Sequence, residues 1–418
     1  MNISQLLTAK IEKKTLSLIK HAGLLADSMG LSAYLVGGMV RDALLGIRPG
    51  KDIDLTVEGD GLGFAQTLAD DLGASYKGFE KFRTARIFLK NGFRIDVASA
   101  RSERYPEPGM LPVVELAAIN HDLYRRDFTI NAMAVRLNKK NYGELIDPFA
   151  GQADLKAGVL KVLHSKSFTD DPTRMLRFIR FKSRFGFKAD ERTQDLFESG
   201  LIKNVFDTVS GERLRDEMLL MLKETKAYEA LKELRDCGAL AILAPGLRLS
   251  AKLKVFFNRL KEEEKEIESD KINNIVIMLI GFLGFSGDRA VESFMKRFKI
   301  CNEWKTAIIQ AGKAKAAAKR LSQKLKPGQV YRLLKDTVKE AVYFLKLTLG
   351  KTAAVNIDGY LKAIKRVRVL VTGDDLIKLG IKPGKKLGAI LGRLMEARLD
   401  GKVNGKREEL EYVKRYLL

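Results

Sequence analysis

One short segment constrains the fold of this chain more than any other: a glycine pair between an apolar strand and a helix. Residues 33–36 read as the strand, Gly37-Gly38 ends it, and residues 39–45 have helical spacing. Residues 52–57 read as a second apolar strand. Glycines at such a junction let backbone N–H groups approach an anion at the helix N-terminus. The segment predicts an α/β unit with a candidate phosphate cradle, although such a junction is also a common packing device.

The second strand carries a pair of acidic side chains. Asp52 and Asp54 flank Ile53, and side chains two positions apart in a strand leave the same face. Adjacent carboxylates repel each other unless cations neutralise them, and hard oxygen ligands of this kind suit Mg²⁺. The pair is therefore a candidate metal site, with a surface accident or a turn as the alternative interpretation.

A hairpin signal supplies a third acidic residue. Asn91-Gly92 separates two further apolar segments, and this dipeptide favours a two-residue hairpin turn. The hairpin places Asp96 on a neighbouring strand, and three carboxylates on one sheet face would hold two metals for an in-line displacement at phosphorus. An ion pair of Asp96 with Arg94 or Arg86 explains the residue equally well, so both interpretations stay open.

The rest of the chain predicts helices. Residues 1–30 read as one amphipathic helix, and beyond about residue 140 helical spacing dominates, for example over 176–187, 212–222 and 228–243. The sequence contains no internal repeat and no proline-rich or Gly/Ser-rich linker. We expect a small mixed α/β unit followed by a long helical remainder.

Charge indicates the kind of partner. The 418 residues carry 75 Lys and Arg against 52 Asp and Glu, which gives a net charge of +23 and a pI near 9.7. Residues 301–418 hold 27 of the basic residues and only 11 of the acidic ones. This excess favours a polyanionic partner, nucleic acid or an anionic membrane surface, whereas a general aid to solubility is the alternative.

Other features exclude several classes of protein. Two cysteines build neither a disulfide framework nor a thiolate metal site, and the longest apolar run, 275–285, is too short to span a bilayer. The three histidines lack ligand spacing, and the absence of a G-x-G-x-x-G fingerprint argues against a dinucleotide-binding oxidoreductase. We expect a cytoplasmic setting and no membrane association.

Five motifs lie in order between residues 31 and 215. They occupy residues 36–42 with 52–54, 125–132, 147–155, 170–174 and 211–213. In this order they resemble the motifs of the class II tRNA nucleotidyltransferases, the CCA-adding enzymes and poly(A) polymerases of the polymerase β-like superfamily. The resemblance extends more weakly to 372–376 and 379–384.

The resemblance implies an α+β fold, in which a polymerase β-like nucleotidyltransferase head precedes an all-α neck, body and tail. It implies a catalytic head over 1–140, a neck that reads the nucleotide base over 141–215, a body over 216–300 and a basic, tRNA-binding tail over 301–418. The implied activity is template-independent addition of CMP and AMP, from CTP and ATP, to the 3′ end of tRNA with Mg²⁺ as cofactor. No protein partner is implied.

The resemblance also assigns roles to single residues. Asp52 and Asp54 match the metal-binding carboxylates, and Asp96 stays a candidate third catalytic carboxylate. Asp171 and Arg174 match the pair that reads the base, with an ordinary i,i+3 salt bridge as the alternative. The residues implied to hold the triphosphate and ribose are Gly37, Gly38, Arg41, Arg126, Asp127 and Asn131. The candidate tRNA-binding residues are Lys313, Lys319, Arg320, Lys365, Arg366, Lys382 and Lys385.

Specificity within the family stays open. The region between Asp96 and Arg125 resembles the flexible element needed for A addition, which disfavours an enzyme that adds only CC. A full CCA-adding enzyme and an A-adding specialist both remain open, as does a catalytically inactive tRNA-binding protein on the same scaffold. The intact pair of Asp52 and Asp54 argues against the last of these.

Overall fold

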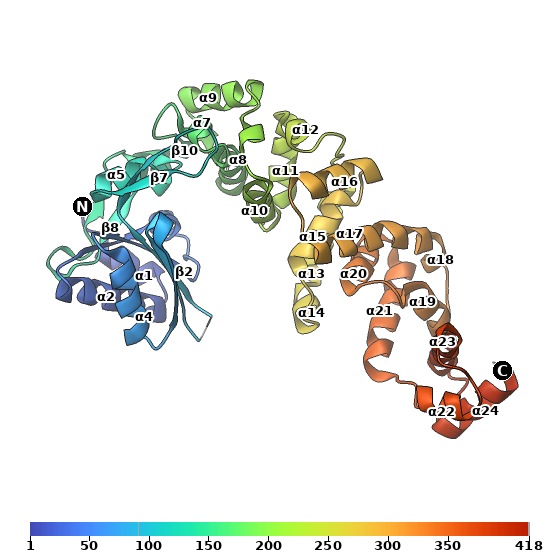
Figure 1. Cartoon of the computed structure of the whole chain (residues 1–418). Helices are drawn as coiled ribbons and strands as arrows, with labels where there is room; N and C mark the ends of the chain where they lie inside the picture. The colour runs from blue at the N-terminus through green and yellow to red at the C-terminus, as the bar shows by residue number, and fades with distance from the viewer. Residues whose placement is uncertain (91, 417–418) are drawn as a thin grey trace. The chain divides into compact units, whose positions relative to one another are not determined.

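The computed structural model describes residues 1–90 and 92–416, and its internal contacts divide the chain into two units. Unit 1 comprises Met1–Met218 and Glu224–Leu243, and unit 2 comprises Leu219–Lys223 and Ala244–Leu418. Figure 1 shows the strands gathered in the first half of the chain and helices throughout the second. The finer division at residues 140, 215 and 300 stays a prediction.

Unit 1 is built on a seven-stranded mixed sheet with the strand order β3-β4-β5-β2-β1-β8-β9. β2 and β5 run parallel, whereas the other neighbouring strands pair antiparallel. The strands are β1 Ser32–Val36, β2 Asp52–Glu58, β3 Ser75–Phe79, β4 Thr84–Phe88, β5 Arg94–Ser99, β8 Ala134–Arg136 and β9 Leu145–Ile146. Two separate pairs are β6 Arg101–Arg104 with β7 Val113–Leu116, and β10 Val159–Leu160 with β11 Lys188–Ala189.

Alternation along β2 gives the sheet one apolar and one polar face. Ile53, Leu55 and Val57 are buried, as the period of two requires for a strand with one covered face. The helices α2 Lys13–Ser28 and α4 Gly61–Asp71 pack against the sheet (Figure 1). The mixed sheet and the strand–glycine–helix junction are thus confirmed.

The prediction of one helix over residues 1–30 is wrong. The chain forms α1 Ser4–Lys10 and α2, separated by Ile11 and Glu12 in extended conformations with ψ near 138° and 139°. The break lets the chain change direction so that Leu7 of α1 and Ile19 of α2 both become fully buried. Periodicity alone did not reveal it, because apolar residues continue across the break at helical spacing.

The hairpin between β4 and β5 is confirmed as an antiparallel pair, although Asn91 of the predicted turn lies outside the described residues. The segment interpreted as a flexible element contains a second hairpin, formed by β6 and β7. Sequence reasoning missed these strands because they are short and largely polar.

The remaining helices of unit 1 match the predicted helical character, with 228–243 broken into two helices at Gly238, where φ is +82°. They are α3 Gly38–Leu44, α5 Ile119–Tyr124, α6 Gly151–Ala157, α7 Ser167–Asp170, α8 Thr173–Phe185, α9 Glu191–Ile202, α10 Gly211–Leu222, α11 Ala227–Asp236 and α12 Ala239–Leu243. Short 3₁₀ turns include η2 Thr129–Asn131.

Unit 2 is helical throughout its described residues. Its helices are α13 Lys252–Glu262, α14 Glu264–Ser269, α15 Asn274–Leu283, α16 Asp288–Arg297, α17 Asn302–Ala314, α18 Ala318–Leu321, α19 Pro327–Leu334, α20 Lys339–Thr348, α21 Lys351–Arg366, α22 Gly373–Lys378, α23 Lys385–Leu399 and α24 Lys406–Tyr416. Within the part of the chain that the structure describes, no helix is both long enough and apolar enough to cross a membrane.

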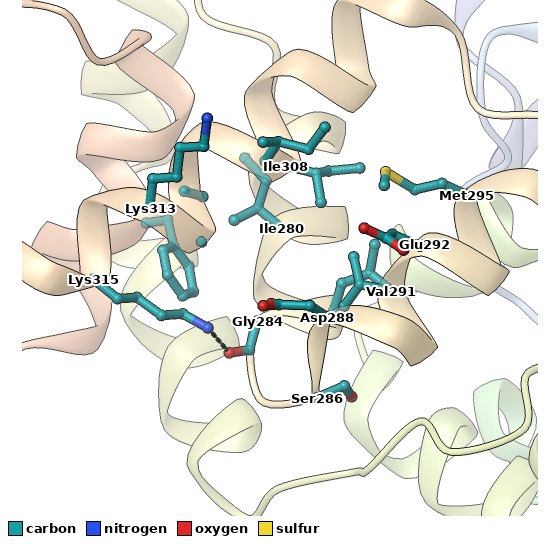
Figure 2. A pocket seen from close by; sticks show the side chains of 15 residues that line it. Ile280, Gly284, Ser286, Asp288, Val291, Glu292, Met295, Ile308, Lys313 and Lys315 are labelled. Atoms are coloured by element: carbon teal, nitrogen blue, oxygen red, sulfur yellow. Dashed lines mark hydrogen bonds between the residues drawn. The ribbon is translucent and has the colours of Figure 1, made fainter.

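A pocket of about 340 Å³ lies in unit 2 between α15, α16 and α17 (Figure 2). Ile280 and Ile308 line its apolar interior, whereas Glu292 lies on the α16 side. Lys315 donates a hydrogen bond to the carbonyl oxygen of Gly284, and burial lowers the pKa of its ammonium group. The Lys315 ammonium group is therefore partly engaged in a contact within the protein.

Candidate active site

The polar face of the sheet brings the predicted carboxylates together. In the parallel register of β2 and β5, Asp52 lies opposite Arg94 and Asp54 lies opposite Asp96. Gly37 adopts a φ of +71°, and a Cβ built on it would lie 3.5 Å from Asp54 Oδ2. The glycine junction and the acidic strand thus meet at one place, as the sequence predicts.

Asp54 is the least compensated of these acidic groups. Burial raises the pKa of its carboxyl group to about 6; the positive charge of Arg126 opposes this shift, while the negative charges of Asp96 and Asp52 add to it. The raised pKa of Asp54 indicates that its surroundings provide too little positive charge to stabilise the ionised carboxylate. A bound cation would supply that charge.

Asp96 forms the ion pairs that one of the two sequence interpretations predicts, whereas its catalytic role stays a prediction. Its Oδ1 lies 3.1 Å from Arg86 Nε and its Oδ2 lies 3.0 Å from Arg94 Nε. Arg94 also reaches Asp52, with Nη2 3.5 Å from Oδ2. Asp96 is therefore an ion-paired residue that also stands beside Asp54 in register.

The donor set fits a divalent cation held by two carboxylates of one strand. Among the described residues no three His, Cys, Asp or Glu side chains converge as a complete metal site. Asp52 and Asp54 would therefore supply two oxygen ligands, and phosphate oxygens of a substrate suit the remaining positions of a hard cation. Asp54 of this pair faces a pocket of about 570 Å³ whose walls also include Asp96, Thr56, Arg86, Arg101 and Arg126.

Arg126 is held in this pocket by a residue whose role sequence reasoning missed. Its Nη2 donates to Asp122 Oδ2 at 2.8 Å and to Thr56 Oγ1 at 3.4 Å. Asp122 is fully buried and also accepts from Arg125 Nη2 at 2.7 Å, and these two arginines lower the pKa of its carboxyl group despite burial. The i,i+3 and i,i+4 spacing of one acid before two arginines was the available signal.

Arg41, Asp127 and Asn131 are brought together, but below the surface of the pocket. Arg41 is 4% exposed, and its Nη1 donates to Asn131 Oδ1 at 2.7 Å. Asn131 Nδ2 in turn donates to Asp127 Oδ1 at 2.9 Å. Burial opposes ionisation of Asp127, but Arg177 and the bond from Asn131 outweigh it and lower its pKa to about 2. Asp127 is thus a permanently charged anchor.

The predicted base-reading pair lies at the start of α8, where the Arg174 N–H donates to the carbonyl oxygen of Asp171, but the described side-chain contacts do not pair the two residues with each other. Asp171 Oδ1 accepts from Thr173 Oγ1 at 2.6 Å and from Arg213 Nη2 at 2.7 Å. Arg174 is 5% exposed and donates to Ser167 Oγ at 2.9 Å. The ordinary i,i+3 salt bridge is therefore not what the structure contains. Each group is fixed by partners of its own.

The second hairpin reaches this pair. Arg213 Nη1 donates to the carbonyl oxygen of Gly109 at 3.0 Å, and the N–H of Gly109 donates to the carbonyl oxygen of Asp170 at 3.3 Å. A Cβ on Gly109 would lie 2.2 Å from Thr208 Oγ1. The segment between β6 and β7 is therefore packed against the neighbours of Asp171, and only glycine fits there.

The candidate tRNA-binding residues all lie in unit 2, at three places along the chain. Lys313, Lys319 and Arg320 lie exposed around the end of α17 and in α18, and Lys382 and Lys385 lie exposed at the start of α23. The third place is the end of α21, with Lys365 and Arg366. Lys365 is paired with Asp270, so its charge is partly committed within the protein.

Comparison with known families matches most of the chain. Residues 33–161 match the poly A polymerase head domain, 207–249 match a probable RNA- and SrmB-binding site of polymerase A, and 271–413 match a putative tRNA nucleotidyltransferase domain 2. The carboxylate pair, the glycine junction and the base-reading candidates fall in or beside the first of these. The fold and the site define a nucleotidyltransferase.

Individual relatives narrow this class. An A-adding tRNA nucleotidyltransferase of Halalkalibacterium halodurans is 33% identical over 99% of this chain and 96% of its own length. One from Geobacter sulfurreducens is 31% identical over 92% of this chain, which spans 45% of that relative. A solved CCA-adding enzyme, apo form II, superposes with a TM-score of 0.78 at 35% identity, covering 99% of this chain and 98% of that one. The chain belongs to the tRNA nucleotidyltransferase family, which includes A-adding and CCA-adding enzymes.

Proposed function

We propose that this enzyme adds nucleotides from CTP and ATP to the 3′ end of tRNA, in CCA addition or repair. The observation that carries the proposal is the meeting of Asp54 and Asp96 in one pocket lined by arginines, with Gly37 close to Asp54. Similar solved structures support the substrates: a Thermotoga maritima CCA-adding enzyme complexed with tRNA, and CCA-adding enzymes complexed with ATP and with CTP. These resemble the chain at 33–34% identity.

The chemistry follows from the pocket. The oxygen of the tRNA 3′-hydroxyl attacks the α-phosphorus, a new phosphodiester bond forms, and the bond to the β-phosphate breaks to release pyrophosphate. Asp52 and Asp54 would hold a divalent ion, Mg²⁺ in our proposal, that neutralises charge on the phosphates. Asp96 would act as a further ligand or accept the proton of the hydroxyl group, and its position opposite Asp54 in the β2–β5 register supports this role.

The remaining residues orient the substrates. Gly37 and Gly38 lie at the start of α3, where backbone N–H groups would bind phosphate oxygens. Asp171 and Arg174 offer one acceptor and one donor to the edge of the incoming base. Asp127 and Asn131 would hold the ribose, and Arg126 would face the triphosphate. The exposed basic residues of unit 2 are proposed to contact RNA phosphates, which A-form RNA presents along both strands.

A second candidate, addition of the terminal A alone, is supported by the curated relatives. The Halalkalibacterium halodurans enzyme, with similar length over nearly the whole chain, is named A-adding. Addition of AMP to a tRNA that ends in CC is common to both candidates. They differ in whether the enzyme incorporates CMP.

One assay separates the candidates and tests the proposal. The purified enzyme is given tRNAs that end before CCA or after CC, each with CTP, ATP or both, and product lengths are read. Three added nucleotides on the first substrate show CCA addition, whereas extension of the second substrate alone shows A addition. Failure to extend either substrate, with Mg²⁺ present and tRNA binding intact, would leave a tRNA-binding protein and contradict the proposal.

A further inference from the structure

A closed ring of polar side chains connects α3, η2, α8 and α10 in unit 1. Each member contacts the next, and the last contacts the first. In order the ring is Asp127, Arg177, Glu217, Arg180, Glu224, Arg184, Asp42, Arg41 and Asn131. Four arginines face four carboxylates, so the ring has no net formal charge.

The half of the ring nearest the candidate ribose site has short contacts. Arg177 Nε and Nη2 lie 2.8 and 2.7 Å from Asp127 Oδ2, so two nitrogens of one guanidinium share a single carboxylate oxygen. Arg177 Nη1 donates to Glu217 Oε1 at 3.1 Å, and Arg180 Nη2 donates to Glu217 Oε2 at 3.3 Å. Glu217 therefore holds two arginines of α8 at once.

The other half returns to the glycine-junction helix. Arg180 Nη1 lies 3.2 Å from Glu224 Oε1. Arg184 then spans Glu224 at 3.7 Å and Asp42 Oδ2 at 3.6 Å. Asp42 accepts from Arg41 Nη2 at 2.8 Å, which leads back through Asn131 to Asp127.

Aromatic rings of α8 stack with the arginines. The Arg180 guanidinium lies 4.7 Å from the centre of the Phe181 ring, and that of Arg41 lies 4.9 Å from the centre of Phe185. Such contacts favour a fixed orientation of the cation over a ring face. Arg41 and Arg180 are each at most 6% exposed, whereas the side chains of Arg177 and Arg184 are about one third exposed, so part of the ring is buried and part reaches the surface.

The spacing on α8 explains why this ring bears on the reaction. Arg177, Arg180 and Arg184 share one helical face, and Arg174 lies one turn before Arg177 on the same helix. Any shift of α8 against the ring moves Arg174 relative to Asp127. The ring therefore fixes the distance between the group proposed to read the base and the group proposed to hold the ribose.

We propose that Glu217, Arg177 and Arg180 are positioning residues that set nucleotide selectivity by holding α8 in register with Asp127. The inference rests on the proposed function of Arg174 and Asp127, and Glu217 lies outside all five sequence motifs. Replacing Glu217 by Gln leaves two arginines without their shared carboxylate, and breaking a buried pair on one side is far more disruptive than removing both partners.

The test compares three proteins with the wild-type enzyme. Glu217→Gln breaks the ring at its double contact, and Arg184→Gln opens it at its longest contacts. Lys182→Gln is the matched control, because Lys182 on the same helix pairs with Glu233 of α11, outside the ring. Steady-state kcat and KM are measured for ATP and CTP on a tRNA that ends in CC, together with Tm and with ATP binding by equilibrium dialysis.

For Glu217→Gln we expect the ratio of kcat/KM for ATP over CTP to fall about tenfold, mainly through a higher KM for ATP, which is the size of one good polar contact. Arg184→Gln should lower the ratio less, and Lys182→Gln should keep it within about twofold. If Glu217→Gln does not fold, Arg184→Gln decides. Unchanged selectivity in the ring variants, with only Tm lowered, would overturn the inference. A wild-type enzyme that extends no tRNA would instead contradict the proposed function, and the dialysis would still report the effect of the ring on ATP binding.

Discussion

Asp54→Asn should make the metal-free protein more stable while it abolishes nucleotide incorporation. The folded-state pKa of Asp54 is raised from 3.8 to about 6, so above pH 6 Asp54 is ionised in both states, and its charge is less favourable in the folded than in the unfolded protein. A shift of this size corresponds to a cost of about 3 kcal/mol at neutral pH, as an order of magnitude. An uncharged amide of the same shape does not pay this cost.

The raised pKa of Asp54 also predicts the direction in which stability changes with pH. The folded state binds the proton more tightly than the unfolded state does, so wild-type stability falls as pH rises from about 4 through 6. The advantage of Asp54→Asn should therefore be full near pH 7.5 and vanish as the pH approaches 4. Urea unfolding of the metal-free protein in EDTA, followed at several pH values, measures this for the transition of unit 1.

The control is Asp52→Asn, because the Asp52 side chain is 69% exposed and its neutralisation should change stability little. Adding millimolar Mg²⁺ should stabilise the wild-type protein and neither variant, since a ligand stabilises only the state that binds it. Equal stability of wild type and Asp54→Asn at pH 7.5, or a gain that persists unchanged at pH 4, would refute the argument that Asp54 lacks compensating charge.

Three further variants test separate parts of the site. Gly37→Ala should reduce incorporation by at least about tenfold, because the methyl group enters the cradle beside the carboxylates; Gly30→Ala, with a similar positive φ and open space around it, is the activity control for backbone strain. Arg213→Gln should lower the discrimination of ATP from CTP, since it frees the hairpin and the base-reading acid, and single-turnover incorporation on tRNA ending in CC measures it. Lys382→Ala should weaken tRNA binding and lower the slope of log affinity against log salt concentration by about one. Lys365→Ala should have a smaller effect, because that lysine is paired with Asp270 within the protein. Filter binding at salt concentrations between about 50 and 200 mM compares the two variants.

The local parts of the site were predictable from the sequence. The period of two placed Asp52 and Asp54 on one face, and the hairpin signal paired the strand of Asp96 with β4, because both follow from strand geometry over a few residues. The parallel pairing of β2 with β5, which sets Asp96 opposite Asp54, joins residues far apart in the chain and does not follow from the hairpin signal. The glycine junction was likewise readable, since a positive φ at Gly37 is a local requirement.

The long-range parts were not predictable in the same way. Arg177 and Asp127 are 50 residues apart, and Arg177 and Glu217 are 40 apart, so no local pattern pairs them. The helical reading of residues 1–30 failed for a related reason: tertiary packing, not periodicity, decides where an amphipathic helix breaks. The family resemblance implied that Arg41 binds the triphosphate or the ribose. Only the structure shows that Arg41 is enclosed among Asp42, Asn131 and the aromatic residues of α8.

Two aspartates of unit 1 show how neighbouring arginines decide whether a desolvated carboxylate is already neutralised or still lacks positive charge. Burial opposes ionisation of both, yet the pKa of Asp127 falls to about 2 while that of Asp54 rises to about 6. The difference lies in the arginines. Two nitrogens of Arg177 contact Asp127 directly. Arg126 has the strongest favourable electrostatic effect on Asp54, but it donates its hydrogen bond to Asp122. Because Arg126 is hydrogen-bonded to Asp122, the negative charge of Asp54 is not fully neutralised, and Asp54 lines the pocket in which we propose that substrate binds. A divalent cation arriving with a nucleoside triphosphate is the partner that such a site favours.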